Sequence, residues 1–240
     1  MKSFSKDHKY LNTYLEAVSE WIEKEILLSI PDGQPKEFLY DLINDYPLRG
    51  GKRFRPALVL LCCELFGGDP EDALNSALAF DLFHNFALIH DDIEDNSIIR
   101  RGEPTLHLKH GTALAINSGD AMFSLVHETL LKNYTRLNEK LALKIHKLLN
   151  SVIRTTFEGQ ALDIGWIEKN IFPNKNEYRD MIVRKTGCYS GSGPCQCGAL
   201  IAGASENDLV NLGIFGEAIG VGFQIRDDLL NLTENNENNP

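Results

Sequence analysis

Two aspartate pairs constrain what this chain can fold into. Asp91 and Asp92 lie in L-I-H-D-D-I-E-D, and Asp227 and Asp228 lie in F-Q-I-R-D-D-L-L, both within apolar runs of helical character. A helix places Asp91 and Asp95 on one face, with Cβ atoms about 6 Å apart. Because such like charges repel each other in an apolar stretch, the spacing favours a divalent cation, and oxygen ligands favour Mg²⁺. Since Mg²⁺ often completes its shell with phosphate, two pairs predict two metal-holding walls facing one polyphosphate.

Apolar residues at helical spacing predict an all-α fold. Helices are expected over residues 11–26, 57–66, 70–95, 119–133, 139–164, 177–185, 199–204 and 206–232. No segment shows the two-residue alternation with hairpin turns that predicts strands. With 240 residues, 43% of them hydrophobic, the chain is long enough for one sizeable core. We expect a single helical domain over 1–232 and a disordered, Asn-rich tail over 233–240.

Charge and cysteine content exclude several classes of protein. Asp and Glu number 34 against 24 Lys and Arg, for a net charge of −10, which argues against a nucleic-acid partner. Five cysteines without a disulfide framework favour buried free thiols in a reduced, cytoplasmic compartment. Cys195-Gln-Cys197 has no second Cys/His pair to complete a metal site. The apolar runs are too short for a transmembrane segment, and the N-terminus lacks a signal-peptide core.

Three basic clusters stand beside small residues and are candidates for phosphate contacts. They are G-G-K-R-F-R-P (50–56), R-R-G (100–102) and K-T-G (185–187), the last followed by a Gly/Ser-rich stretch. Glycine lets a backbone approach a phosphate, and Lys or Arg supplies the charge. Each cluster alone fits a solvated charged surface better than a binding site, and the first aspartate segment alone fits a solvated acidic helix end equally well. Their combination in one acidic chain favours diphosphate binding.

These motifs together resemble those of the trans-isoprenyl diphosphate synthases, the polyprenyl synthetase family. The matching segments are 50–56, 88–107, 119–123 (G-D-A-M-F), 159–163 (G-Q-A-L-D), 185–187 and 223–232, in family order. The resemblance implies an isoprenoid-synthase-type helical bundle around a central cavity, and a homodimer. It also implies Mg²⁺-dependent condensation of isopentenyl diphosphate with an allylic diphosphate.

The resemblance also implies roles for individual residues. The metal ligands would be Asp91, Asp95 and Asp227, with Asp228 beside the last. The group assigned to catalysis is Asp91, Asp92, Asp95, Arg100, Lys185 and Asp227. The allylic diphosphate would be bound by Arg100, Lys185, Thr186 and Gln224, and isopentenyl diphosphate by Lys52, Arg55, His84 and Arg101. A lone histidine on an apolar helix face is more often a core residue, but His84 precedes Asp91 by two turns of the same face.

Product length in this family depends on the bulk below the first aspartate motif. Phe86, with small Ala87 next to it, is expected to form the cavity floor and to stop elongation at C15–C20, nearest the C20 geranylgeranyl diphosphate. Phe86 is equally compatible with an ordinary core aromatic, and the two roles agree with each other.

The chain departs from the family pattern at its C-terminal end. Asn231 stands where many members have a further aspartate, and members usually continue for several more helices. Relative to the family this is a C-terminally short, apparently truncated, geranylgeranyl diphosphate synthase-like chain, either naturally short or a piece of a longer one. We expect it to fold but to be a weak catalyst alone. The alternative function is a non-catalytic regulatory or scaffold subunit of a heteromeric prenyl synthase.

Overall fold

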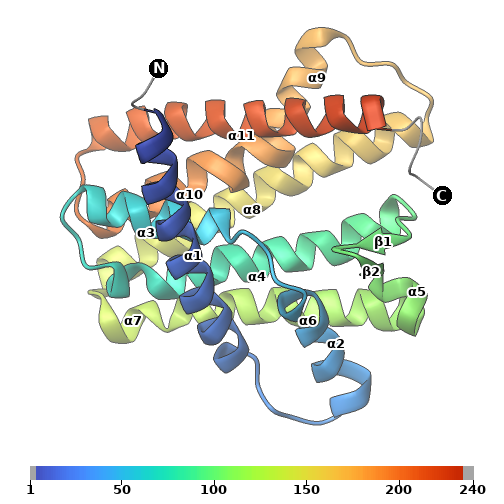
Figure 1. Ribbon diagram of the computed structural model, residues 1–240, viewed down its shortest axis with the longest axis horizontal. Coiled ribbons are helices and arrows are strands. Elements are labelled where there is room, and N and C mark those ends of the chain that lie inside the picture. The colour runs from blue at the N-terminus through green and yellow to red at the C-terminus, as the bar shows by residue number, and fades with distance from the viewer. Residues whose placement is uncertain (1–3, 235–240) are drawn as a thin grey trace. The chain divides into compact units, whose positions relative to one another are not determined.

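The computed structural model describes the backbone of residues 4–234 and the side chains of residues 10–230, and nearly all of that chain is helical (Figure 1). The helices before residue 112 are α1 (Phe4–Ser29), η1 (Lys36–Tyr40), α2 (Asp41–Leu48), α3 (Phe54–Leu65), α4 (Pro70–Glu94) and α5 (Leu106–His110). Those after it are α6 (Thr112–Leu131), α7 (Asn133–Arg136), α8 (Glu139–Glu168), α9 (Lys175–Ile182), η2 (Val183–Ser192), α10 (Gly193–Ile201) and α11 (Glu206–Glu234). The predicted all-α class is confirmed.

One short hairpin within the described residues was not predicted. Strands β1 (Ile99–Arg100) and β2 (Glu103–Pro104) pair antiparallel, with Arg100 opposite Glu103. The two turn residues, Arg101 and Gly102, both have positive φ angles, 53° and 81°. This is the backbone geometry of a tight two-residue hairpin turn, which glycine adopts readily and arginine rarely.

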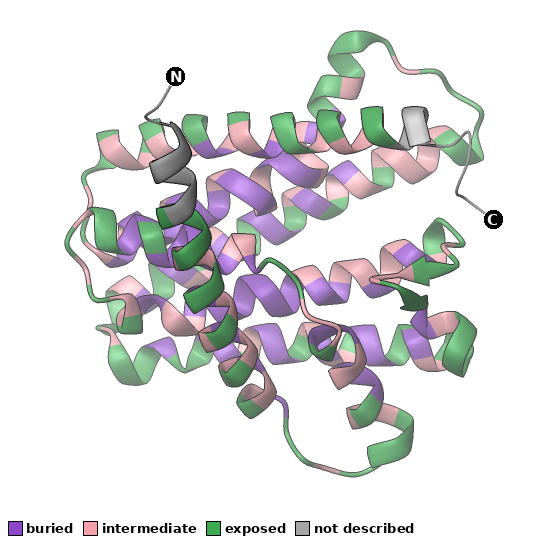
Figure 2. Cartoon of the chain, viewed as in Figure 1, coloured by how far each residue is buried: buried purple, intermediate pink, exposed green. Residues whose placement is uncertain are grey.

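The chain forms two compact units, of which the first comprises Met1–Leu60 and Pro70–Ala142. In this unit α4 packs along α6, and α1, α2, α5 and α7 also contact α4. Because neighbours surround it, α4 is buried along most of its length (Figure 2). Its core includes the fully buried rings of Phe80 and Phe83.

The second unit comprises Leu61–Asp69 and Leu143–Pro240. Here η2 and α10 pack against α11. A Cβ added at Gly216 would lie 2.6 Å from the backbone of Gly191, and one at Gly220 would lie 2.8 Å from the Cα of Gly187. Backbones approach this closely only where side chains are absent. A Cβ at Gly222 would meet nothing within 4 Å, so that glycine has no close neighbour to accommodate.

Three segments differ from their sequence-based expectation. Helices α9, η2 and α10 follow one another without a break from Lys175 to Ile201, so the Gly/Ser-rich stretch is helical rather than a loop. Residues 36–48, in which Pro47 lies inside α2, were not predicted to be helical. Of the predicted disordered tail, residues 235–240 lie outside the described residues, while α11 continues to Glu234.

Other expectations have mixed outcomes. All five cysteines are free thiols, and all but Cys188 are buried, as predicted. Within the part of the chain that the structure describes, no helix is long and apolar enough to cross a membrane. A single domain over 1–232 stays a prediction.

Candidate active site

The first aspartate motif lies at the C-terminal end of α4. The helix ends at Glu94, and the Asp95 N–H donates to the Asp91 carbonyl at 2.8 Å, so the two aspartates are one turn apart. The Asp91 side chain is 27% exposed, and Asp95 is exposed. A helix C-terminus carries partial negative charge, which disfavours further carboxylates and favours a cation. Asp91 and Asp95 are therefore accessible carboxylates at a position that attracts positive charge.

Asp92, between them, has a different environment. Its side chain is fully buried, and one oxygen accepts a hydrogen bond of 2.5 Å from the Tyr46 hydroxyl. Arg100 donates through Nε at 3.0 Å and through Nη2 to the other oxygen. Burial lowers the pKa of Arg100, but the hydrogen bonds and charge of Asp92 outweigh it and raise that pKa. Asp92 is thus engaged by protein donors and oriented away from solvent.

The hairpin that carries Arg100 and Arg101 is attached to α2. The Arg49 guanidinium donates to the carbonyls of Arg100 and Pro104, each at 2.8 Å. Arg101 donates to the Tyr46 carbonyl at 2.8 Å, and its guanidinium lies 3.3 Å from where a Cβ on Gly51 would be. Gly51 has a φ of 151° and Gly50 a φ of 75°, which explains glycine at both positions.

The cations of the two N-terminal basic clusters converge on His84. Burial, and then the charges of Arg55, Arg101, Arg100 and Arg53, lower the pKa of His84 well below its ordinary value. His84 is therefore neutral at pH 7 and lies in a positive field contributed by segments 53–55 and 100–101. A site of this kind attracts an anion.

Arg53 and Lys52, which are adjacent, have opposite environments. Arg53 is 4% exposed and makes an ion pair of 2.7 Å with the buried Asp81, so it is a structural cation. It also donates to the Pro47 carbonyl at 2.7 Å. Lys52 is exposed, and Arg55 is partly exposed. Lys52 and Arg55 are thus accessible to a ligand, and their role as substrate contacts stays a prediction.

Phe86 belongs to an aromatic cluster between α4 and α6. It is 6% exposed, and its ring centroid lies 5.0 Å from that of Phe123 and 5.8 Å from that of Phe83. The His90 ring lies 4.7 Å from it on the side of the aspartate motif. Ala87 is partly exposed. Phe86 is therefore a core aromatic one turn before His90.

The second unit holds the other predicted residues in a connected network. Thr186 of η2 donates to Gln224 of α11 at 2.6 Å, and Gln224 donates to Asp228 at 2.8 Å. The Tyr178 hydroxyl of α9 donates to the other Asp228 oxygen at 2.5 Å. Burial, and then this hydrogen bond, raise the pKa of Tyr178 to about 12, so it remains a donor at neutral pH.

Lys185 and Asp227 lie beside that network. Lys185 makes an ion pair of 2.6 Å with Asp163 of α8, and both side chains are partly exposed. Asp227 is also partly exposed. Lys185 and Thr186 lie on a π-helical segment, a geometry that is frequent at functional sites. The predicted role of Asn231 falls outside the described side chains.

The predicted metal was tested against the donors present. Among the side chains of residues 10–230, no three His, Cys, Asp or Glu residues form a cluster that would hold an ion alone. Mg²⁺ is usually held by one or two carboxylates together with water and substrate phosphate. Asp91 and Asp95 supply such a pair, so the donor set fits Mg²⁺ bound together with a diphosphate.

Comparison with known proteins identifies the family. The family described as polyprenyl synthetase matches residues 36–239. The chain belongs to the polyprenyl synthetase family. It is 39% identical to a short chain isoprenyl diphosphate synthase of Methanothermobacter thermautotrophicus, over 93% of this chain and 67% of the relative. It is 37% identical to a geranylgeranyl diphosphate synthase of Sulfolobus acidocaldarius, over 93% of this chain and 66% of the relative.

A solved structure supports the same assignment. The geranylgeranyl pyrophosphate synthetase of Pyrococcus horikoshii matches this polyprenyl synthetase family member with a TM-score of 0.86 and 34% identity. The match covers 93% of this chain and 67% of that one. The chain thus spans about two thirds of the length of these relatives.

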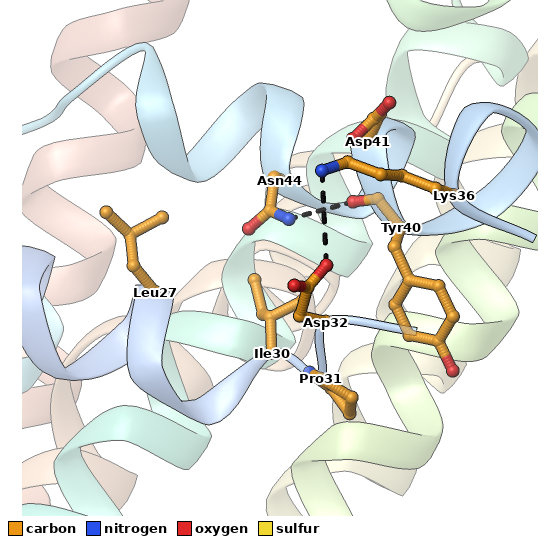
Figure 3. A pocket seen from close by; sticks show the side chains of 8 residues that line it. All are labelled: Leu27, Ile30, Pro31, Asp32, Lys36, Tyr40, Asp41 and Asn44. Atoms are coloured by element: carbon orange, nitrogen blue, oxygen red, sulfur yellow. Dashed lines mark hydrogen bonds and ion pairs between the residues drawn. The ribbon is translucent and has the colours of Figure 1, made fainter. Parts of the chain in front are cut away.

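A cavity elsewhere in the first unit is separate from these motifs. It has a volume of about 310 Å³ and is lined by residues of α1, η1 and α2 and the loop between α1 and η1 (Figure 3). Its lining includes Asp32 and Lys36, 4.0 Å apart and well exposed, but none of the residues predicted for the site. It gives this family member no second candidate site.

Four residues that contact the predicted site were not found from the sequence: Tyr46, Arg49, Asp163 and Tyr178. Asp163 lies in the matching segment G-Q-A-L-D, which signalled the family but assigned no role to the carboxylate. Tyr46 and Arg49 lie shortly before the first basic cluster, in Y-P-L-R-G-G. Their position next to that cluster is the feature of the sequence that could have indicated a role in the site. Tyr178 has no comparable signal.

Proposed function

We propose that the chain is a Mg²⁺-dependent prenyltransferase that condenses isopentenyl diphosphate with an allylic diphosphate to a C15–C20 product. The observation that carries the proposal is in the first unit. Two accessible carboxylates lie at the C-terminal end of α4, and arginines from two segments place positive charge on the side of the neutral His84. Carboxylates that fit a metal at the end of α4, and cations of segments 53–55 and 100–101 that fit an anion, match a metal–diphosphate substrate. The names of the relatives support a C20 product.

The cations divide between the two substrates. Lys52, Arg55 and Arg101, with His84 as a neutral hydrogen-bonding group, bind the diphosphate of isopentenyl diphosphate. Arg100 and Lys185, with Thr186 and Gln224, bind the allylic diphosphate. A guanidinium presents a planar fork to phosphate oxygens, whereas the Lys185 ammonium is a point charge that exchanges Asp163 for the substrate.

Asp91, Asp95 and Asp227, with Asp228 beside it, would hold Mg²⁺, which supplies Lewis-acid stabilisation of the departing diphosphate. Arg100 and Lys185 hold the oxygens on which negative charge develops as the allylic C–O bond breaks. The alkene of isopentenyl diphosphate then attacks the allylic carbon, which leaves a cation on the inner carbon of that alkene. A proton is lost from the carbon next to this cation, and a new double bond forms. The leaving diphosphate is the proton acceptor, so no protein carboxylate acts as a nucleophile.

The test of function is a product assay on the purified chain with Mg²⁺, isopentenyl diphosphate and C5, C10 and C15 allylic diphosphates in turn. We expect prenyl diphosphate products that disappear when a chelator removes the metal. A folded chain that forms no product alone, but restores or redirects synthesis by a full-length family member, would instead support the regulatory-subunit alternative. Light scattering of the same sample tests the proposed homodimer.

The chain-length proposal rests on Phe86 and has its own test. Phe86→Ala removes a ring packed against Phe123, so we expect longer products, together with a loss of roughly 3–5 kcal/mol of stability. Chromatography of the dephosphorylated products measures the first effect, and urea unfolding the second. Tyr134→Phe, a change of an exposed ring in the same unit, is the control. An unchanged product distribution from folded Phe86→Ala would exclude Phe86 as the floor.

A further inference from the structure

Tyr46 is the most connected buried polar residue beside the first aspartate motif. It lies in α2 and is fully buried, with its ring 4.7 Å from the Arg49 guanidinium. The Leu106 N–H donates to the Tyr46 hydroxyl oxygen at 3.2 Å, and the hydroxyl donates to Asp92 at 2.5 Å. The Tyr46 hydroxyl therefore accepts one hydrogen bond, from Leu106, and donates its own proton to Asp92.

Asp92, held by Tyr46, in turn fixes the orientation of Arg100. A buried carboxylate requires partners for both oxygens, and Tyr46 and Arg100 are the partners of Asp92. Arg100 contacts both oxygens, Oδ1 through Nη2 and Oδ2 through Nε at 3.2 Å, the two-point contact that makes a guanidinium coplanar with a carboxylate. The hydroxyl that holds the carboxylate therefore also sets the plane of the guanidinium. The Arg100 side chain remains 29% exposed, so its outer edge is accessible to a ligand.

The same tyrosine contacts Arg101 through a different group. Arg101 donates to the Tyr46 carbonyl at 2.8 Å, a contact that no side-chain substitution at 46 removes. Arg49 holds the backbone of the hairpin itself, through the carbonyls of Arg100 and Pro104. Arg100 thus depends on the Tyr46 hydroxyl, Arg101 depends on the backbone of α2, and both depend on Arg49.

We propose that the Tyr46 hydroxyl is a positioning group that, through Asp92, aims the Arg100 guanidinium at the allylic diphosphate. It does not aim Arg101. The identity of the substrate rests on the proposed function, whereas the coupling of Tyr46 to anion binding by Arg100 does not.

The first test is the kinetics of Tyr46→Phe, which keeps the ring and removes only the hydroxyl. We expect the KM for the allylic diphosphate to rise about tenfold, equivalent to about 1.4 kcal/mol, and the KM for isopentenyl diphosphate to change less than about twofold. Tyr134→Phe is the matched control and should change neither. Equal increases in both constants would overturn the proposal, since a general disturbance of the hairpin produces that result.

A double-mutant cycle separates positioning from a merely structural role. Arg100→Lys keeps the charge but loses the two-point contact with Asp92. In that background Tyr46→Phe should change the allylic KM less than about twofold, because coupled residues are non-additive. A further tenfold rise would show that Tyr46 acts independently of Arg100 and would overturn the proposal.

Two further measurements keep the proposal testable in every case. If the chain forms no prenyl product, the proposed function fails, but calorimetry with inorganic diphosphate still reports on Arg100. Tyr46→Phe should weaken that binding about tenfold, and unchanged binding would contradict the proposal. If Tyr46→Phe does not fold, Arg49→Gln provides the test. It releases the hairpin backbone and should raise both KM values, and an effect on isopentenyl diphosphate alone would contradict the proposal.

Discussion

The aspartate motifs of the two units share one hydrogen-bonding arrangement but differ in the charge of the second partner. In each, the second aspartate of the pair accepts a hydrogen bond of 2.5 Å from a tyrosine on another helix, Tyr46 for Asp92 and Tyr178 for Asp228. Asp92 is fully buried and has a charged second partner, whereas Asp228 is partly exposed and has the neutral Gln224. A fully buried carboxylate such as Asp92 needs a positively charged partner. A partly exposed carboxylate such as Asp228 is also hydrated, so a neutral amide partner is sufficient.

The cores behind the motifs also differ. Behind the first motif, α4 and α6 are joined by the large rings of Phe86 and Phe123. Behind the second, η2 and α11 meet at glycines, with Gly187 against Gly220. This close approach lies next to the hydrogen bond between Thr186 and Gln224. These side chains are too short to reach each other if large rings separated the two helices. Close helix packing therefore determines which polar contacts the second motif makes.

The strongest test of the shared arrangement is to remove the first aspartate of each pair. Asp91→Ala and Asp227→Ala should each lower kcat/KM by orders of magnitude, since each ~1.4 kcal/mol of lost transition-state stabilisation costs tenfold. Asp72→Ala, at the opposite end of α4, is the control and should stay near parental activity. Steady-state kinetics measures the effect. Near-parental turnover of Asp91→Ala would refute the metal assignment.

Alanine substitutions on α11 test the glycine packing. Gly216→Ala places a Cβ 2.6 Å from the Gly191 backbone and should cost about 3 kcal/mol or more of unfolding free energy. Gly222→Ala, on the same helix but in open space, should be neutral or stabilise by up to about 1 kcal/mol. Urea unfolding compares the two. Similar losses for both would show that helix propensity, rather than close approach, governs these positions.

Lysine substitutions test whether Lys52 and Lys185 bind different diphosphates. Lys52→Ala should raise chiefly the KM for isopentenyl diphosphate, by about tenfold, equivalent to loss of one charged contact of about 1.4 kcal/mol. Lys185→Ala should change chiefly the allylic KM or kcat. Lys24→Ala, a change of an exposed lysine of α1, is the control. If both lysines gave the same kinetic pattern, the assignment of Lys52 and Lys185 to different substrates would be wrong.

The smallest expected difference concerns the two tyrosine hydroxyls. Tyr46→Phe should cost about 2 kcal/mol of unfolding free energy, because it removes a hydrogen bond to a fully buried charge. Tyr178→Phe should cost about 1 kcal/mol, because water reaches Asp228. Chemical unfolding of both variants against the parental chain measures the difference. A greater loss for Tyr178→Phe would reverse the comparison between the motifs.

Much of the fold and part of the site were predictable because they depend on local spacing. Apolar periodicity located the long helices, and an i,i+4 spacing placed Asp91 and Asp95 one turn apart. The hairpin escaped prediction because its strands are two residues each, too short for alternation to show. The Gly/Ser-rich stretch lies between two expected helices, and it is helical because packing against α11 offsets the low helix propensity of glycine.

The sequence by itself determined the helical class, the family and the identity of the candidate residues, since these depend on residue types and spacings along the chain. Only the tertiary structure decided what each charged residue does. It pairs Arg53 with Asp81, 28 residues away, and Asp92 with Tyr46, 46 residues away. The charge of a side chain can be read from its identity, but its environment comes from segments distant in the sequence. That environment leaves Asp91 accessible and buries its neighbour Asp92.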